Sequence, residues 1–326
     1  MGVAPGGIEG SSREGGVWFG RVLRLPLALA LSVLVASEVL TDRFAAVQVA
    51  WWVPRSFLLA FAVAWILVLL ALPWTRARRR ERRAAWRWVV ITAALALWTT
   101  PRDWRPFGPN GAGAALVLVH WNAGSPEESE ADRAAEALLA TGADIVLVTD
   151  PGRLWHGARG EALRAAGYTS VSGGRFGLAS RLPVAEARPV LASRLRVVSR
   201  FVVATPAGPL ALDGVDLPSA PTLPRALLTR TLAADLAELG HAPGDVLAGD
   251  FNISRGSASL ANLAPDAVEA FGATGRGWGG SYPRQTPFWP IDLTLVRAPW
   301  RPVAARYLDL GVGRHRAQMV ALERAE

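Results

Sequence analysis

The tetrapeptide Gly249-Asp250-Phe251-Asn252 is the part of this sequence best suited to chemistry. It follows the apolar run 246–248, which predicts a buried strand. Alternate residues of a strand point to the same side, so Asp250 and Asn252 would present a carboxylate and a carboxamide together at the strand's C-terminal end. Such a pair can hold a hard divalent cation beside a phosphoryl oxygen.

Polar residues recur at the ends of other predicted strands. An Asp at one strand end is usually a turn or cap residue, so a single case carries little information. Repetition is more informative, because α/β scaffolds build their sites from strand ends that are distant in sequence. The residues in such positions are Asn122, Asp150, Asp216, Asp250, Asn252, Asp292 and His315.

The second part of the chain alternates strand and helix patterns, which predicts an α/β domain over 108–326. A linker rich in Pro and Gly, 101–113, precedes most of this pattern. The predicted helices cover 127–141, 160–166 and 225–239. The predicted strands cover 115–121, 144–149, 177–180, 196–204, 210–215, 246–251, 291–296 and 318–322.

Composition points to a membrane portion. The chain has 326 residues, of which 51% are hydrophobic, and its mean hydropathy is +0.23. Soluble domains of this size seldom average apolar. The absence of Cys excludes disulfides, thiolate metal sites and cysteine nucleophiles. The net charge of +8 comes entirely from Arg, and much of it lies in the run 76–83 between apolar segments.

The apolar segments predict a membrane region within residues 1–107, after a disordered start over 1–16. We expect two or three transmembrane helices, at about 22–40, 51–73 and 84–100, since a span needs about 20 apolar residues. The third segment is the shortest. The arginine run should be cytoplasmic by the positive-inside rule, which places the α/β domain outside the cytoplasm if the third segment spans. The expected location is the cell (inner) membrane, in a multi-pass arrangement.

Over residues 114–323 the chain resembles the endonuclease/exonuclease/phosphatase superfamily, which has the DNase I-like fold. The family's landmarks occur in order at Trp121-Asn122, 144–150, 177–184, Gly249-Asp250-Phe251-Asn252, Ser281-Tyr282-Pro283, Pro290-Ile291-Asp292 and Gly313-Arg314-His315-Arg316. The resemblance implies a four-layer, two-sheet α/β sandwich that hydrolyses phosphate esters with Mg²⁺ or Mn²⁺.

The same resemblance implies a role for each site residue. Asp150, Asp250 and Asn122 would bind the metal, and Asn122, Arg314 and Asp216 would bind substrate. Asp250 and Asn252 would position the attacking water and the phosphoryl oxygens. His315, oriented by Asp292, would contact the phosphoryl group or act as a base.

Three positions depart from the family pattern. Asp150 is one methylene shorter than the usual Glu, Asp216 stands where His is frequent, and Arg314 replaces an Asp. An arginine can hold a phosphate through two parallel hydrogen bonds. The same changes also fit a site that has lost metal catalysis. Four further arginines are either solvated or line a phosphate cleft, namely Arg153, Arg159, Arg175 and Arg200.

Three functions stay open at the level of sequence. The first is a membrane-anchored, metal-dependent phosphoesterase, because the architecture resembles teicoplanin-resistance-like membrane phosphatases that act on polyprenyl pyrophosphate lipids. The second is a nuclease of the same superfamily, which would show a steep salt dependence. The third is a binding module that keeps the fold without the chemistry. The expected partners are the lipid bilayer and a phosphate-containing substrate, with nucleic acid less favoured.

Overall fold

The computed structural model describes residues 22–72, 79–109, 113 and 116–325. These residues divide into two compact units. One unit contains residues 22–40 and 53–101, and the other contains residues 41–52 and 102–325. The predicted disordered start and residues 76–78 of the arginine run lie outside the described residues.

The first unit consists of helices α2 (Leu25–Leu40), α4 (Arg55–Ala71) and most of α6 (Arg79–Asp103). The predicted helix over 51–73 is wrong at its start, because Pro54 interrupts the segment and α4 begins at Arg55. The helices of the first unit pack through a small apolar cluster that includes Leu27, Leu31 and Ile66. Within the described residues, no single helix is both long and apolar enough to cross a bilayer. One bent pair, formed by α2 and α3 (Ala45–Trp52), meets both criteria when its two helices are taken together.

The second unit is built on two six-stranded sheets. The strand order of the first sheet is β10 (Val268–Glu269), β12 (Asp292–Val296), β9 (Val246–Asp250), β8 (Gly208–Asp216), β7 (Val197–Thr205), β6 (Val184–Ala192). The strand order of the second is β13 (Trp300–Leu308), β14 (Ala317–Arg324), β2 (Leu116–Asn122), β3 (Ile145–Thr149), β5 (Phe176–Ser180), β4 (Thr169–Gly173). A small separate pair joins β1 (Trp104–Arg105) to β11 (Gly277–Trp278).

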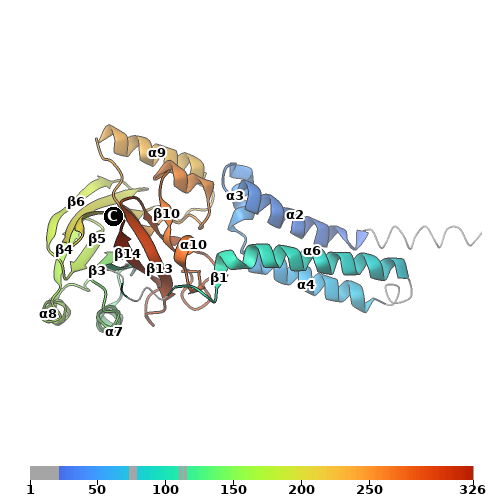
Figure 1. Cartoon of the computed structure of the whole chain (residues 1–326), viewed down its shortest axis with the longest axis horizontal. Helices are drawn as coiled ribbons and strands as arrows, with labels where there is room; N and C mark the ends of the chain where they lie inside the picture. Colours follow the sequence, from blue (N-terminus) through green and yellow to red (C-terminus); the bar gives the residue numbers. More distant parts are fainter. Residues whose placement is uncertain (1–21, 73–78, 110–112, 114–115, 326) are drawn as a thin grey trace, which may run out of the picture. The chain divides into compact units, whose positions relative to one another are not determined.

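The two sheets pack face to face, and helices cover their outer faces (Figure 1). Inward residues such as Leu118, Leu147 and Leu212 form the core between the sheets. On one outside lie α7 (Glu128–Ala140) and α8 (Gly157–Ala165), and on the other lie α9 (Arg225–Glu238) and the 3₁₀ helix η1 (Ala258–Asn262). The short helix α10 (Ala270–Thr274) follows β10. This arrangement confirms the predicted two-sheet α/β sandwich in four layers.

Two parallel strand pairs set the position of the site. Strands β2 and β3 are parallel and joined through α7, and β8 and β9 are parallel and joined through α9. The remaining pairs within the two sheets are antiparallel. Parallel strands end at the same edge of a sheet, so each crossover brings two C-terminal ends together.

Residues 41–52, assigned to the membrane region from sequence, belong to the sandwich unit. The reason lies in polar side chains that this segment buries against the sandwich. The amide of Gln48 donates to the carbonyl oxygens of Pro221 and Leu223 at 2.8 and 2.9 Å, and accepts from the backbone N–H of Arg225 at 2.7 Å. The indole of Trp51 donates to Ser257 Oγ at 2.7 Å. The domain therefore begins before residue 108.

We expect Gln48→Ala to destabilise the sandwich unit. The substitution removes three hydrogen bonds at a side chain that is 2% exposed, and it leaves two carbonyls and an N–H without their partner. A loss of about 2–4 kcal/mol should lower the melting temperature by roughly 5–10 °C. The matched control is Val49→Ala, because Val49 is the next residue and is 67% exposed. Equal melting temperatures for the two variants would contradict the docking described here.

Candidate active site

The centre of the site is a row of three carboxylates on the inner face of one sheet. The register pairs Asp216 of β8 with Asp250 of β9, and Asp250 with Asp292 of β12. Neighbouring strands are about 4.8 Å apart, so the three carboxylates lie close together. All three side chains are largely buried. Their crowding concentrates negative charge at the end of the sandwich core.

The opposite sheet adds an amide and an imidazole to this row. Asn122, at the end of β2, donates from Nδ2 to Asp250 Oδ2 at 2.8 Å. His315 places Nδ1 2.8 Å from Asp292 Oδ2 and Nε2 4.0 Å from Asp250 Oδ2. The indole of Trp121 holds the backbone of His315 through a 3.2 Å hydrogen bond to its carbonyl. The site therefore bridges the two sheets.

The local backbone explains the Gly-Asp-Phe-Asn motif. A Cβ on Gly249 would lie 1.8 Å from the carbonyl oxygen of Val215, so only glycine allows β8 and β9 to approach this closely. Phe251 is fully buried in the outer core beneath α9. Asn252 has a φ of +47°, its N–H donates to Asp250 Oδ1 at 3.0 Å, and its Nδ2 donates to the Leu217 carbonyl at 2.7 Å. Asn tolerates this left-handed conformation better than most residues.

Almost all of the predicted site residues line one pocket of about 750 Å³. The exception is Asp292, which is fully buried behind His315 and reaches the pocket through it. The convergence follows from strands that bring their ends to one edge of the sandwich. The predicted residues that line the pocket are Asn122, Asp150, Asp216, Asp250, Asn252, Arg314 and His315.

Burial and crowding shift the protonation of this cluster. Burial, reinforced by the negative charges of Asp292 and Asp216, raises the pKa of Asp250 to about 8. Burial also raises the pKa of Asp216 to about 6. Burial alone would lower the pKa of His315, but the charge and hydrogen bond of Asp292 and the charge of Asp250 outweigh it and raise that pKa to about 9. At neutral pH His315 is therefore an imidazolium that faces the pocket.

The donor set fits a divalent cation. Ligand atoms of Asp250, Asp292 and His315 lie within 4.8 Å of one another. Asp292 Oδ1 is buried and makes no hydrogen bond within the described part of the chain. Carboxylate oxygens suit Mg²⁺ and Mn²⁺. A divalent cation would neutralise the negative charges that help to raise the pKa of Asp250.

Asp150, predicted as a metal ligand, is paired with an arginine. It lines the pocket, but Arg175 binds both of its carboxylate oxygens at 2.8 Å. Asp150 also adopts a left-handed φ of +48°. As arranged, its oxygens are engaged by an arginine rather than open to a cation.

Several pocket residues were not predicted as site residues from sequence. Trp52, Arg194, Tyr282 and Trp289 line the pocket, as does Arg175. Only Arg175 had been considered, as one of four arginines without an assigned place. Tyr282 lies within the predicted landmark Ser281-Tyr282-Pro283, and Trp289 directly precedes the landmark Pro290-Ile291-Asp292, so their aromatic character beside these motifs was the available signal. Trp52 could not be found this way, because it lies within an apolar segment.

The aromatic residues organise one side of the pocket. The rings of Tyr282 and His315 are 4.8 Å apart between centroids. The guanidinium of Arg314 donates to the Tyr282 hydroxyl at 2.7 Å. The indole of Trp289 donates to the Trp52 carbonyl at 2.8 Å. Arg314 is thereby held beside His315, where both present positive charge to the pocket.

Residues 119–315 match the profile of the Endonuclease/Exonuclease/phosphatase family. The chain belongs to this family. Enzymes of the Endonuclease/Exonuclease/phosphatase family are hydrolases that act on phosphate esters and use divalent metal ions. Phosphate ester hydrolysis is therefore the activity class of this chain, which agrees with a pocket that combines carboxylates, an imidazolium and arginines.

Solved structures that are similar to this chain include the following three. A mannosyl-6-phosphatase from Bacteroides thetaiotaomicron superposes with a TM-score of 0.50 at 13% identity, covering 64% of this chain and 99% of that chain. The human Nocturnin catalytic domain with bound sulfate superposes with a TM-score of 0.50 at 13% identity, covering 65% of this chain and 94% of that chain. TDP2 from D. rerio, complexed with a single-strand DNA product, superposes with a TM-score of 0.47 at 18% identity, covering 64% of this chain and 98% of that chain. A comparison with curated proteins finds no match.

The geometry assigns distinct tasks to the side chains of this family member. Phosphoryl transfer depends mainly on positioning and charge neutralisation. When bound, a divalent cation supplies positive charge against the phosphoryl oxygens. Asp292 fixes the ring of His315 by accepting from Nδ1–H, which leaves Nε2–H to donate toward a phosphoryl oxygen. Arg314 offers further donors from the same side.

Replacement of the central carboxylate should stabilise the metal-free protein. Since the folded-state pKa of Asp250 is raised from 3.8 to about 8, ionisation costs stability as pH rises through that window. Asp250→Asn removes this cost. We expect its melting temperature in EDTA to exceed that of the wild type by roughly 5 °C or more at pH 8, because one pKa unit corresponds to about 1.4 kcal/mol.

The stabilisation by Asp250→Asn should grow between pH 5 and pH 8 and then level off. Thermal melts of the full-length chain at several pH values measure it. A constant difference across this range would show that Asp250 is not held protonated by its surroundings.

The pKa of His315 should fall when Asp292 loses its charge. Asp292→Asn keeps the side-chain volume but removes the electrostatic and hydrogen-bonding support that raises the pKa to about 9. We expect a decrease of at least one unit. The chain has four histidines, so imidazole NMR signals can be assigned by substitution. The His156 signal serves as the internal control, and an unchanged His315 titration would contradict the proposed pairing.

Proposed function

We propose that this chain is a membrane-anchored phosphoesterase that hydrolyses the phosphate of a lipid-linked substrate, with its sandwich domain outside the cytoplasm. The chemistry follows from the family and the charged floor of the pocket. The lipid character of the substrate follows from the walls of that pocket. The membrane anchor rests on the apolar helices α2 and α4 and on the overall composition.

The carrying observation is that one pocket joins phosphate-binding side chains to an apolar surface. The charged part contains arginines, His315 and the three aspartates of the pocket lining, which are Asp150, Asp216 and Asp250. An apolar group attached to a phosphate would gain about 25 cal/mol per Å² of surface buried against the apolar part. The apolar side chains of the lining are Trp52, Ala123, Leu195, Val197, Leu217, Pro218, Pro221, Trp289 and Ile291.

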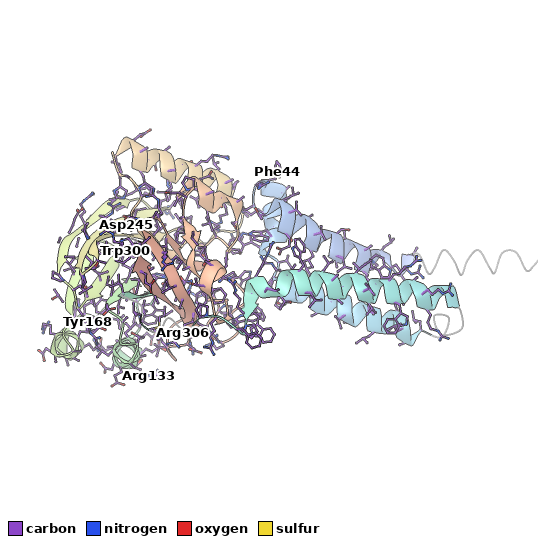
Figure 2. The ribbon with its side chains drawn as sticks, viewed as in Figure 1. Phe44, Arg133, Tyr168, Asp245, Trp300 and Arg306 are labelled. Atoms are coloured by element: carbon purple, nitrogen blue, oxygen red, sulfur yellow. The ribbon has the colours of Figure 1, made fainter. Side chains whose placement is uncertain are left out.

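The segment that provides Trp52 also carries exposed apolar side chains. Phe44, labelled in Figure 2, directly precedes α3 and is 58% exposed, and Val49 within α3 is 67% exposed. Exposed apolar side chains next to a site are typical of proteins that work at a membrane surface. This segment therefore supports a substrate drawn from the bilayer.

A nuclease function has weaker support. Arg175, Arg194 and Arg314 line the pocket and could contact a nucleic-acid backbone. However, Arg175 is paired with two aspartates. The pocket's apolar lining suits a hydrocarbon chain better than a polynucleotide.

The full-length chain in detergent, supplied with Mg²⁺ or Mn²⁺, tests the proposal. We expect release of phosphate from farnesyl diphosphate at a kcat/KM at least tenfold above that for inorganic pyrophosphate. Faster turnover of single-stranded DNA than of farnesyl diphosphate would favour the nuclease. No turnover of any phosphate ester by folded protein would refute the proposal. A reporter enzyme fused to the C-terminus, active only outside the cytoplasm, tests the orientation.

Trp52→Ala should impair lipid-linked substrates selectively. Loss of one aromatic wall costs about 1–2 kcal/mol of apolar contact, so kcat/KM for farnesyl diphosphate should fall roughly tenfold. Turnover of p-nitrophenyl phosphate should change less than twofold. Phe44→Ala is the matched control, since Phe44 lies in the same segment but outside the pocket lining. Equal losses on both substrates would mean that Trp52 supports only the fold.

A further inference from the structure

Arg175 lies in the pocket lining and forms ion pairs with two aspartates. It lies in the turn between β4 and β5, where its carbonyl accepts from the N–H of Asp150 at 3.0 Å. Its Nε and one terminal nitrogen donate to the two oxygens of Asp150, each at 2.8 Å. The other terminal nitrogen lies 3.0 Å from Asp216 Oδ2. One guanidinium thus joins the ends of β3 and β8, which belong to opposite sheets.

These contacts connect two of the departures from the family pattern. Asp150 is shorter than the usual Glu, and Asp216 replaces a frequent His. Both carboxylates meet the same arginine, and the pairing with Asp150 is bidentate, which is the strongest form of a charge-assisted hydrogen bond. The two changes are therefore complementary. Together they create a binding place for a guanidinium at this end of the pocket.

We propose that Arg175 is a built-in cation of this site, which occupies Asp150 and Asp216 and confines a divalent cation to the part of the pocket around Asp250. The inference deepens the proposed function, and it rests on that function for the presence of a divalent cation in this pocket. A guanidinium stays charged throughout the physiological range. It therefore supplies positive charge at this end of the pocket without any metal.

Competition with a metal follows from the same geometry. A divalent cation bound through Asp150 would have to break the two hydrogen bonds from Arg175. It would also lie close to the displaced guanidinium, and like charges at short range repel. Removal of Arg175 frees two carboxylates at once and removes this repulsion. Substitution of Arg175 should therefore change the affinity of the site for a divalent cation more than substitution of Asp150 does.

Calorimetric titration of the full-length, metal-free chain with Mn²⁺ tests the inference. We expect Arg175→Ala to bind Mn²⁺ at least tenfold more tightly than the wild type, or to gain a second equivalent. Arg159→Ala is the matched control, because Arg159 also bridges two carboxylates, Asp132 at 2.8 Å and Glu128 at 2.7 Å. Arg159 lies outside the pocket lining, so its removal should change Mn²⁺ affinity less than threefold.

Asp150→Asn identifies the residue responsible. In the wild-type background it should change Mn²⁺ affinity less than threefold, whereas in the Arg175→Ala background it should abolish the gain. A tenfold loss from Asp150→Asn alone would establish Asp150 as a metal ligand and overturn the inference. A gain in Arg175→Ala that persists without Asp150, or no gain at all, would also overturn it.

The outcome is separable from the proposed function. The titration measures binding alone, and melting temperatures confirm that each variant folds. A gain in Mn²⁺ affinity in a protein that hydrolyses no phosphate ester would support the inference and refute the function. Hydrolysis by the wild type, together with unchanged Mn²⁺ binding in Arg175→Ala, would support the function and refute the inference.

Discussion

Electrostatic repulsion within one row of carboxylates is the constraint on which this site depends. Asp216, Asp250 and Asp292 face the same side of three neighbouring strands. At a strand spacing of about 4.8 Å, each adjacent pair of charges would repel by about 3 kcal/mol at an effective dielectric constant of 20. Positive groups and shared protons offset this repulsion. His315 pairs with Asp292 and Arg175 pairs with Asp216, and Asp250 is left for a cation or a proton.

The pocket also depends on a segment outside the sandwich sequence. Residues 41–52 are held by buried hydrogen bonds from Gln48 and Trp51, and they bring Trp52 into the lining. An apolar helix can be buried in a protein or in a bilayer, and composition alone does not distinguish the two. A polar side chain within it, here Gln48, has to find partners, and those partners decide where the helix lies.

The fold was predictable where strands are central. Central strands such as β2, β3 and β9 are buried on both faces and appear as short apolar runs. Within the two large sheets, the described strands that sequence patterns did not reveal are β4, β6, β10 and β13, and each lies at the edge of its sheet. Edge strands carry polar residues and proline, as in the sequence of β6 with Pro189, because one side of the strand has no strand neighbour within its sheet. Their pattern therefore lacks the signal of burial.

The sequence by itself determined the fold class, the family and the candidate site residues at the strand ends, because short apolar runs and short motifs are local properties. Only the tertiary structure decided their partners. The register placed Asp250 between Asp216 and Asp292, and the turn after β4 brought Arg175 to Asp150. Such pairings join residues that are distant along the chain, and they depend on how the two sheets meet, which no local pattern encodes.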